Sequence, residues 1–125
     1  MREAIDEALT IASLALRDGY TRTAANRAYY AMFYAAQLYL RERAADEVGD
    51  SKTHAGTRRQ FDRFAIKRDG LDRSLSTALA QVEELRLTSD YELARPDPTT
   101  EVAGHALKTA EWFVRTVLAA LDDPR

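Results

Sequence analysis

A cation and two phenols share one side of a segment that is otherwise almost entirely apolar. The segment runs from Ala25 to Leu40, with Arg27, Tyr30 and Tyr34 spaced by three and four residues. In a helix these three side chains lie on one stripe. Because an unpaired buried arginine is prohibitively costly, the stripe must face a partner or a wet groove. We expect Arg27 to hold phosphate there and a tyrosine ring to stack on a base.

A histidine at a predicted helix start is a second candidate. His54 follows Lys52 and Thr53 where a helix is expected to begin. The helix dipole would lower the pKa of this imidazole and keep it neutral, and nearby N–H groups favour an anion. A neutral imidazole beside an anion suits a general base. The alternative is that His54 caps the helix or packs against a neighbour; His105, the other histidine, is expected to be structural.

Two groups of charged residues could assist. Arg86 and Asp90 are four residues apart, so they are neighbours on one helix face and could form an ion pair. That pair could instead hold Arg86 in place for a ligand phosphate, and Tyr91 adds a phenol on the adjoining face. A further basic stripe could steer an anion, or be a solvated face that acidic neighbours partly neutralise. Its members are Arg59, Arg63 and Lys67.

The elements that must position these residues are all predicted to be helical. Proline occurs only at positions 96, 98 and 124, and no strand-length run alternates. Gly19 and Gly70 are natural helix stops, and Pro96 begins a clear break. The expected helices run over about 2–18, from 21 to about 42–45, from about 52–54 to 69, from about 71 up to the break at Pro96, and over about 99–121, with a polar connection over 46–51. Five helices with short connections make an antiparallel bundle.

The helix between residues 21 and 45 is apolar on nearly every side, so it should lie in the middle of the bundle. Thr21 or Thr23 should cap its start, and Thr99 or Thr100 the start of the last helix. The expected inward positions of the others are Ile5, Leu9, Ala12 and Leu16; Phe61, Phe64 and Ala65; Leu71, Leu75, Ala78, Val82 and Leu85; and Val102, Ala106, Ala110, Phe113, Val117 and Leu121.

Composition limits the class of protein. The chain has 125 residues, 46% hydrophobic and 30% charged, which predicts one globular domain over 1–125. It has no cysteine, no histidine pair at metal-ligand spacing, no apolar run near the roughly 20 residues of a membrane span and no signal-peptide pattern. We therefore expect a cytoplasmic protein with no metal site or cofactor. Its net charge of −2 argues against a generally basic nucleic-acid binder.

Three segments together resemble the small prokaryotic HEPN domains (higher eukaryotes and prokaryotes nucleotide-binding). They are Asn26–Ala36, with the sequence NRAYYAMFYAA; Lys52–His54, with KTH; and Arg86–Tyr91, with RLTSDY. The first segment is rather specific, while the other two gain weight from their order and spacing. With the five predicted helices, the resemblance covers almost the whole chain.

That resemblance implies a homodimeric helical bundle that is paired with a minimal nucleotidyltransferase (MNT) in a toxin–antitoxin system. Active members of the superfamily are metal-independent ribonucleases. They bring together, across the dimer, an arginine and a histidine from an Arg-x(4–6)-His motif and cleave RNA through its own 2′-hydroxyl. The histidine would move the proton and the arginine would stabilise the phosphorane charge. In some pairs the nucleotidyltransferase adenylylates a tyrosine of the HEPN partner, for which Tyr91 is the nearest candidate here.

The chain departs from that motif. No arginine precedes His54 or His105 with four to six residues between them. Arg86 is followed by Asp90 and Tyr91 and by no histidine, and the usual pKa of aspartate is far below neutral. A site of this kind would therefore need His54 from another helix.

We consider three hypotheses, in this order. The first is a HEPN-fold partner of a nucleotidyltransferase, which binds nucleotide or RNA in one groove. The second is a metal-independent ribonuclease toxin with a variant site of His54 and Arg86. The third is a non-catalytic interaction module in which arginines pair with Asp90 and other carboxylates. The groove of the first hypothesis contains Arg27, Tyr30, Tyr34, His54, Arg86, Asp90 and Tyr91, with Arg59, Arg63 and Lys67 steering the ligand.

Overall fold

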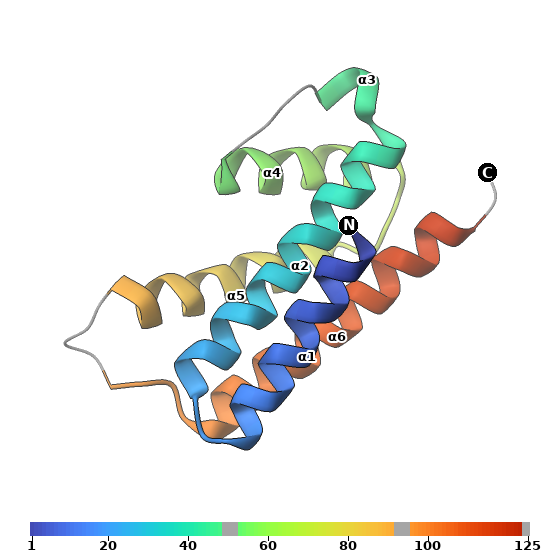
Figure 1. Ribbon diagram of the computed structural model, residues 1–125. Helices are drawn as coiled ribbons and strands as arrows, with labels where there is room; N and C mark the ends of the chain where they lie inside the picture. The colour runs from blue at the N-terminus through green and yellow to red at the C-terminus, as the bar shows by residue number, and fades with distance from the viewer. Residues whose placement is uncertain (49–52, 92–95, 124–125) are drawn as a thin grey trace.

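The computed structural model describes residues 1–48, 53–91 and 96–123, and the side chains of Val48, Asp90 and Tyr91 also fall outside this description. Every regular element in these ranges is helical, which confirms the predicted all-α bundle (Figure 1). The elements are α1 (Arg2–Arg17), α2 (Thr21–Arg43), α3 (Ala45–Val48), α4 (His54–Phe61), the π-helix η1 (Asp62–Arg68), α5 (Ser74–Tyr91) and α6 (Thr100–Asp122).

Helix α2 lies at the centre of the bundle, as its sequence predicts. It packs against α1, α4, α5 and α6 (Figure 1). Two adjacent apolar faces of α2 are buried: Tyr29, Phe33, Ala36 and Leu40 lie on one, and Ala28, Met32, Ala35 and Tyr39 on the next. Its partly exposed residues include Asn26, Arg27, Tyr30, Tyr34 and Gln37, so the stripe left uncovered is polar and aromatic.

The turn between α1 and α2 forms at the predicted glycine, but the predicted threonine cap is wrong. Gly19 has φ of +83°, a conformation that glycine adopts without steric cost, and it ends α1. The N-cap of α2 is Tyr20, which makes no side-chain capping bond, and Thr21 is already the first helical residue. By contrast, Thr99 caps α6 as expected, because its Oγ1 accepts the N–H of Val102 at 3.1 Å.

Arginines at helix ends fix the directions of α1, α2 and α6. Arg43, in the last turn of α2, donates to the backbone oxygens of Ala120 and Leu121 at 3.1 and 3.0 Å. These are C-terminal carbonyls of α6, which cationic side chains stabilise. At the other side Arg2 pairs with Asp122 at 2.8 Å. The last turns of α2 and α6 are therefore neighbours, and α1 runs in the opposite direction (Figure 1).

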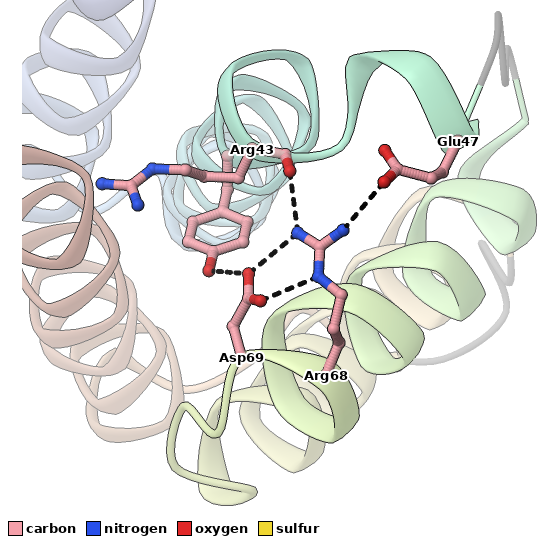
Figure 2. A network of polar contacts seen from close by, with 5 residues as sticks. Arg43, Glu47, Arg68 and Asp69 are labelled. Carbon is pink, nitrogen blue, oxygen red and sulfur yellow. Dashed lines mark hydrogen bonds and ion pairs between the residues drawn. The ribbon is translucent and has the colours of Figure 1, made fainter. Parts of the chain in front are cut away.

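The segment predicted as one helix over about 52–69 changes type after Phe61. Residues 62–68 form a π-helix that buries the three consecutive residues Phe64, Ala65 and Ile66. Arg68 stabilises the C-terminal end of this π-helix: its guanidinium pairs with Asp69 and Glu47 and donates a hydrogen bond to the carbonyl oxygen of Arg43 at 2.7 Å (Figure 2). Tyr39 of α2 donates to Asp69 at 2.6 Å. This network ties η1 to the ends of α2 and α3 and so holds α4 in place.

Three other expectations need correction. Val102 does not belong to the apolar seam of α6: it is 45% exposed in a hollow between α5 and α6, whereas the other five expected positions are buried. The connection predicted over 46–51 begins as the one-turn helix α3, and its residues 49–51 lie outside the described ranges. Helix α5 begins at Ser74 and not near Leu71, because Asp72 accepts the Ser74 N–H at 2.9 Å.

In α1 the buried line is shifted from the expected one. Ile5 and Ala12 are fully buried as predicted, together with Ala8 and Ala15, while Leu9 and Leu16 lie partly buried at its edge. None of the helices in the described ranges is both long and apolar enough to span a bilayer.

Candidate functional site

Tyr30 is the residue on which the separate candidates of the sequence converge. The Arg27 guanidinium lies over its ring at 4.8 Å from the centroid, and the Tyr34 ring centroid is 5.8 Å away. The His54 ring meets it edge-on at 5.8 Å, and the Arg86 guanidinium lies 5.5 Å from its centroid. Four of the seven residues predicted to share a groove therefore lie around the ring of a fifth, Tyr30, which is itself partly exposed.

Arg86 enters this cluster from α5 although it is only 6% exposed. Its guanidinium lies 4.9 Å from the Tyr29 ring centroid, so Arg86 faces two tyrosine rings of α2. Aromatic faces attract a cation, and the attraction strengthens where water is excluded. Arg27, on the more exposed side, is held by the Asn26 side-chain oxygen at 2.7 and 2.9 Å. The cluster thus places two cations beside the Tyr30 ring, where a phosphate could bind.

His54 begins α4, as predicted, and its ring is clamped. Thr53 caps the helix by accepting the Gly56 N–H at 2.9 Å. The His54 ring stacks on Phe33 with centroids 4.4 Å apart and planes 12° apart. Its Nδ1 atom is 2.7 Å from the Tyr29 hydroxyl oxygen. The side chain is therefore fixed by α2 in both position and rotation.

A chain of hydrogen bonds runs inward from His54. Tyr29, which is 1% exposed, donates its hydroxyl proton to Glu83 Oε2 at 2.9 Å. Glu83 is 8% exposed, and its other oxygen pairs with Arg58. Burying a carboxylate is tolerable only when partners of this kind satisfy it. The order of contacts is His54, Tyr29, Glu83 and Arg58.

This series of hydrogen bonds determines which ring nitrogen of His54 carries the proton. A phenol has one proton, and Tyr29 gives it to the Glu83 carboxylate, so its oxygen must accept from His54 Nδ1–H. Nε2 is then the unprotonated ring atom of the neutral imidazole. Burial lowers the pKa of His54 and the nearby Arg86 charge lowers it further. Burial also raises the pKa of Tyr29 to about 12, so this phenol keeps its proton at neutral pH.

The sequence predicted the direction of the His54 pKa shift but missed three members of the site. Tyr29, Glu83 and Arg58 were not among the residues predicted for the groove. A signal was present for Tyr29, since a buried phenol needs a hydrogen-bond partner. Glu83 also lies three residues before Arg86, hence on the same side of one helix.

The three residues of the predicted basic stripe have separate surroundings. Arg59 lines a hollow between α4 and α5. Arg63 lies over the Phe64 ring at 5.0 Å, and Lys67 pairs with Asp62 at 3.1 Å. All three are exposed, and the change from α- to π-helical winding intervenes between Arg59 and Arg63. Whether they steer a ligand stays a prediction.

The remaining candidates have the following places. Asp90 and Tyr91 belong to the last turn of α5, but their side chains lie outside the described residues, so the expected Arg86–Asp90 pair does too. His105 is exposed beside Val102 in the hollow between α5 and α6. In the parts of the chain with described side chains, no three His, Cys, Asp or Glu residues gather as a metal site would require.

The described structure is thus an all-helical bundle that gathers two arginines, a histidine and tyrosines against its central helix α2. The chain belongs to the HEPN domain family, whose model matches residues 1–120. It is also similar to a protein of Methanocaldococcus jannaschii that bears the name "Putative toxin MJ0605". The two are 27% identical over 121 residues, which cover 97% of this chain and 86% of the relative.

Proposed function

We propose that this HEPN protein is toxin-like and binds the phosphate of a nucleotide or RNA at the cluster around Tyr30. In this proposal Arg27 and Arg86 hold the phosphate, His54 hydrogen-bonds it or the adjoining sugar, and an aromatic ring stacks on a base. The protein acts as a cytoplasmic homodimer, with a nucleotidyltransferase as its partner in a toxin–antitoxin-type system.

The observation that supports this proposal best is the convergence on Tyr30. Arg27, His54 and Arg86 come from three different helices, yet each contacts this one partly exposed ring. A bundle stabilised only by its core has no need to bring two cations and an imidazole to one place. The family and the toxin name of the relative favour the toxin-like role.

Binding of fluorescently labelled single-stranded RNA, followed by anisotropy in EDTA, tests the proposal. Arg27→Gln should weaken binding by about 10- to 100-fold, since a charge-assisted contact contributes about 1.5–3 kcal/mol. Arg86→Gln should do the same, although its burial makes a folding control by circular dichroism necessary. Arg41→Gln, an exposed position on the same helix as Arg27, is the matched control and should bind as wild type. Wild-type affinity in folded Arg27→Gln would refute the site.

The partner and the toxin role have their own test. Expression of the protein should arrest growth, Arg27→Gln should relieve the arrest, and coexpression of a neighbouring nucleotidyltransferase gene should suppress it. Unimpaired growth at high expression would contradict the toxin role. It would leave RNA binding to be judged by the anisotropy experiment.

The His54 tautomer favours a second candidate, a metal-independent ribonuclease. With Nδ1–H donated to Tyr29, Nε2 can take the proton of an RNA 2′-hydroxyl. The 2′-oxygen then bonds to phosphorus as the bond to the 5′-oxygen breaks, and that oxygen takes a proton from water while His54 returns its own proton to the solvent. The products are a 2′,3′-cyclic phosphate and a 5′-hydroxyl end. Arg86 would stabilise the charge on the phosphorane.

Cleavage of an RNA pool in EDTA distinguishes the two candidates. A ribonuclease produces cyclic-phosphate ends, which His54→Ala abolishes and His105→Ala, the other histidine, leaves unchanged. Binding without cleavage supports the first candidate. If RNA is neither bound nor cut, the third hypothesis of a non-catalytic interaction module becomes the better description.

A further inference from the structure

A basic hollow lies beside the proposed site and shares only Arg58 with it. It has a volume of about 380 Å³ and opens between α4 with the start of η1 on one side and the start of α5 on the other. Its lining combines three guanidinium groups with two hydroxyls. The lining residues are Arg58, Arg59, Asp62, Arg73, Ser76, Thr77 and Ala80.

The charges in this hollow do not cancel. Its carboxylate, Asp62, pairs with Lys67 at 3.1 Å and accepts the Ser76 hydroxyl at 3.2 Å. Arg58 pairs with Glu83. Two positive charges remain, on the exposed residues Arg59 and Arg73. Guanidinium forks beside a hydroxyl suit phosphate oxygens, and a concave wall raises the local concentration of an anion.

Arg58 connects this hollow to the cluster around Tyr30. It lines the hollow and pairs with Glu83, which accepts from Tyr29, which in turn bonds to His54. Both regions contact helix α4, which has His54 as its first residue and Arg58 and Arg59 about one turn further along. Two places for phosphate, one at the Tyr30 cluster beside the start of α4 and one in the hollow further along this helix, fit a polymer with regularly repeated phosphates.

We propose that Arg59 and Arg73, with the Thr77 hydroxyl, form a second phosphate subsite for single-stranded RNA. The inference rests on the proposed function and deepens it: the ligand of the Tyr30 cluster is an oligonucleotide and not a mononucleotide. One phosphate lies at Arg27 and Arg86, and the strand continues past Arg58 so that a later phosphate enters the hollow.

The test compares two probes, AMP and a single-stranded RNA of about ten nucleotides, within the range of strand lengths such proteins cover. Arg59→Gln/Arg73→Gln removes two contacts, which should lower the slope of log K against log salt by about 1.4. If the electrostatic attraction is negligible near 1 M salt, a slope lower by about 1.4 over the tenfold range down to about 0.1 M salt reduces the RNA affinity at about 0.1 M by about 25-fold. AMP binding should not change. Both side chains are exposed, so the variant should fold normally.

The Arg63→Gln variant tests whether any loss of RNA affinity is specific to the hollow or comes from general electrostatic attraction by the predicted basic stripe. Arg63 is equally exposed and four residues beyond Arg59, but it does not line the hollow, so RNA affinity should fall less than threefold. Equal losses in both variants, or RNA binding that Arg59→Gln/Arg73→Gln leaves intact, would overturn the subsite alone. If the wild type binds neither probe, the proposed function fails and the subsite with it.

Discussion

The sharpest prediction concerns the hydroxyl of Tyr29. Tyr29→Phe keeps the buried ring, which packs against Phe33 and His54, and removes only the oxygen that joins His54 to Glu83. The bond donated to the Glu83 carboxylate contributes about 1.5–3 kcal/mol, and the bond from His54 about 1 kcal/mol. Because phenylalanine recovers part of this by better burial, we expect unfolding to become easier by about 2–3 kcal/mol.

Urea denaturation measures this loss, and Tyr34→Phe is the matched control. Tyr34 lies on the same helix and packs against Tyr30, but it is partly exposed, so its change should stay within about 0.5 kcal/mol. The slope of the unfolding free energy against urea should be the same in all three proteins. Equal, small losses in the two variants would refute the buried hydrogen-bond chain.

The tautomer of His54 provides an independent measurement. Long-range proton–nitrogen NMR should show Nδ1 protonated in the wild type. In Tyr29→Phe the acceptor is gone, so the Nε2-protonated form should become the more populated one, as is usual for free histidine side chains. A loss of packing alone would not move the proton from one ring nitrogen to the other. An Nε2-protonated wild type would contradict the assignment and remove the support for the ribonuclease candidate.

Three further predictions concern charge and backbone. The pKa of His54 should lie below 6.5 in the folded protein, so as the pH falls the unfolded chain is protonated at this residue before the folded one. The unfolding free energy of the wild type should therefore decrease below about pH 6.5, and that of His54→Gln should decrease less. Gly70→Ala should cost about 1 kcal/mol in thermal unfolding because φ is +77°. Gly104→Ala should stabilise by up to about 1 kcal/mol, because Gly104 is helical and an added Cβ would make an ordinary contact at 3.7 Å with the Leu16 side chain; the reverse order would be inconsistent with these backbones. Thr99→Ala should cost about 1 kcal/mol by loss of the cap, and Thr100→Ala much less.

Tyr30 and Glu83 illustrate which parts of the site could be predicted from the sequence and which could not. Spacing alone placed Arg27, Tyr30 and Tyr34 on one stripe, because that depends only on the period of a helix. The order and type of residues around His54 and Arg86 suggested that they join this stripe. Nothing in the sequence placed Glu83 beneath Tyr29, because that contact depends on how α5 is rotated and shifted against α2.

The sequence by itself determined the helical class, the central position of α2 and the stops at Gly19 and Gly70, since all of these follow from local periodicity and backbone preference. The tertiary structure decided the π-helical turn after Phe61, the exposure of Val102 and the tautomer of His54. Each of these depends on which neighbour a side chain meets across the bundle. The free energy of these contacts comes from packing and from hydrogen bonds to buried polar groups, neither of which the pattern of residues along the sequence specifies.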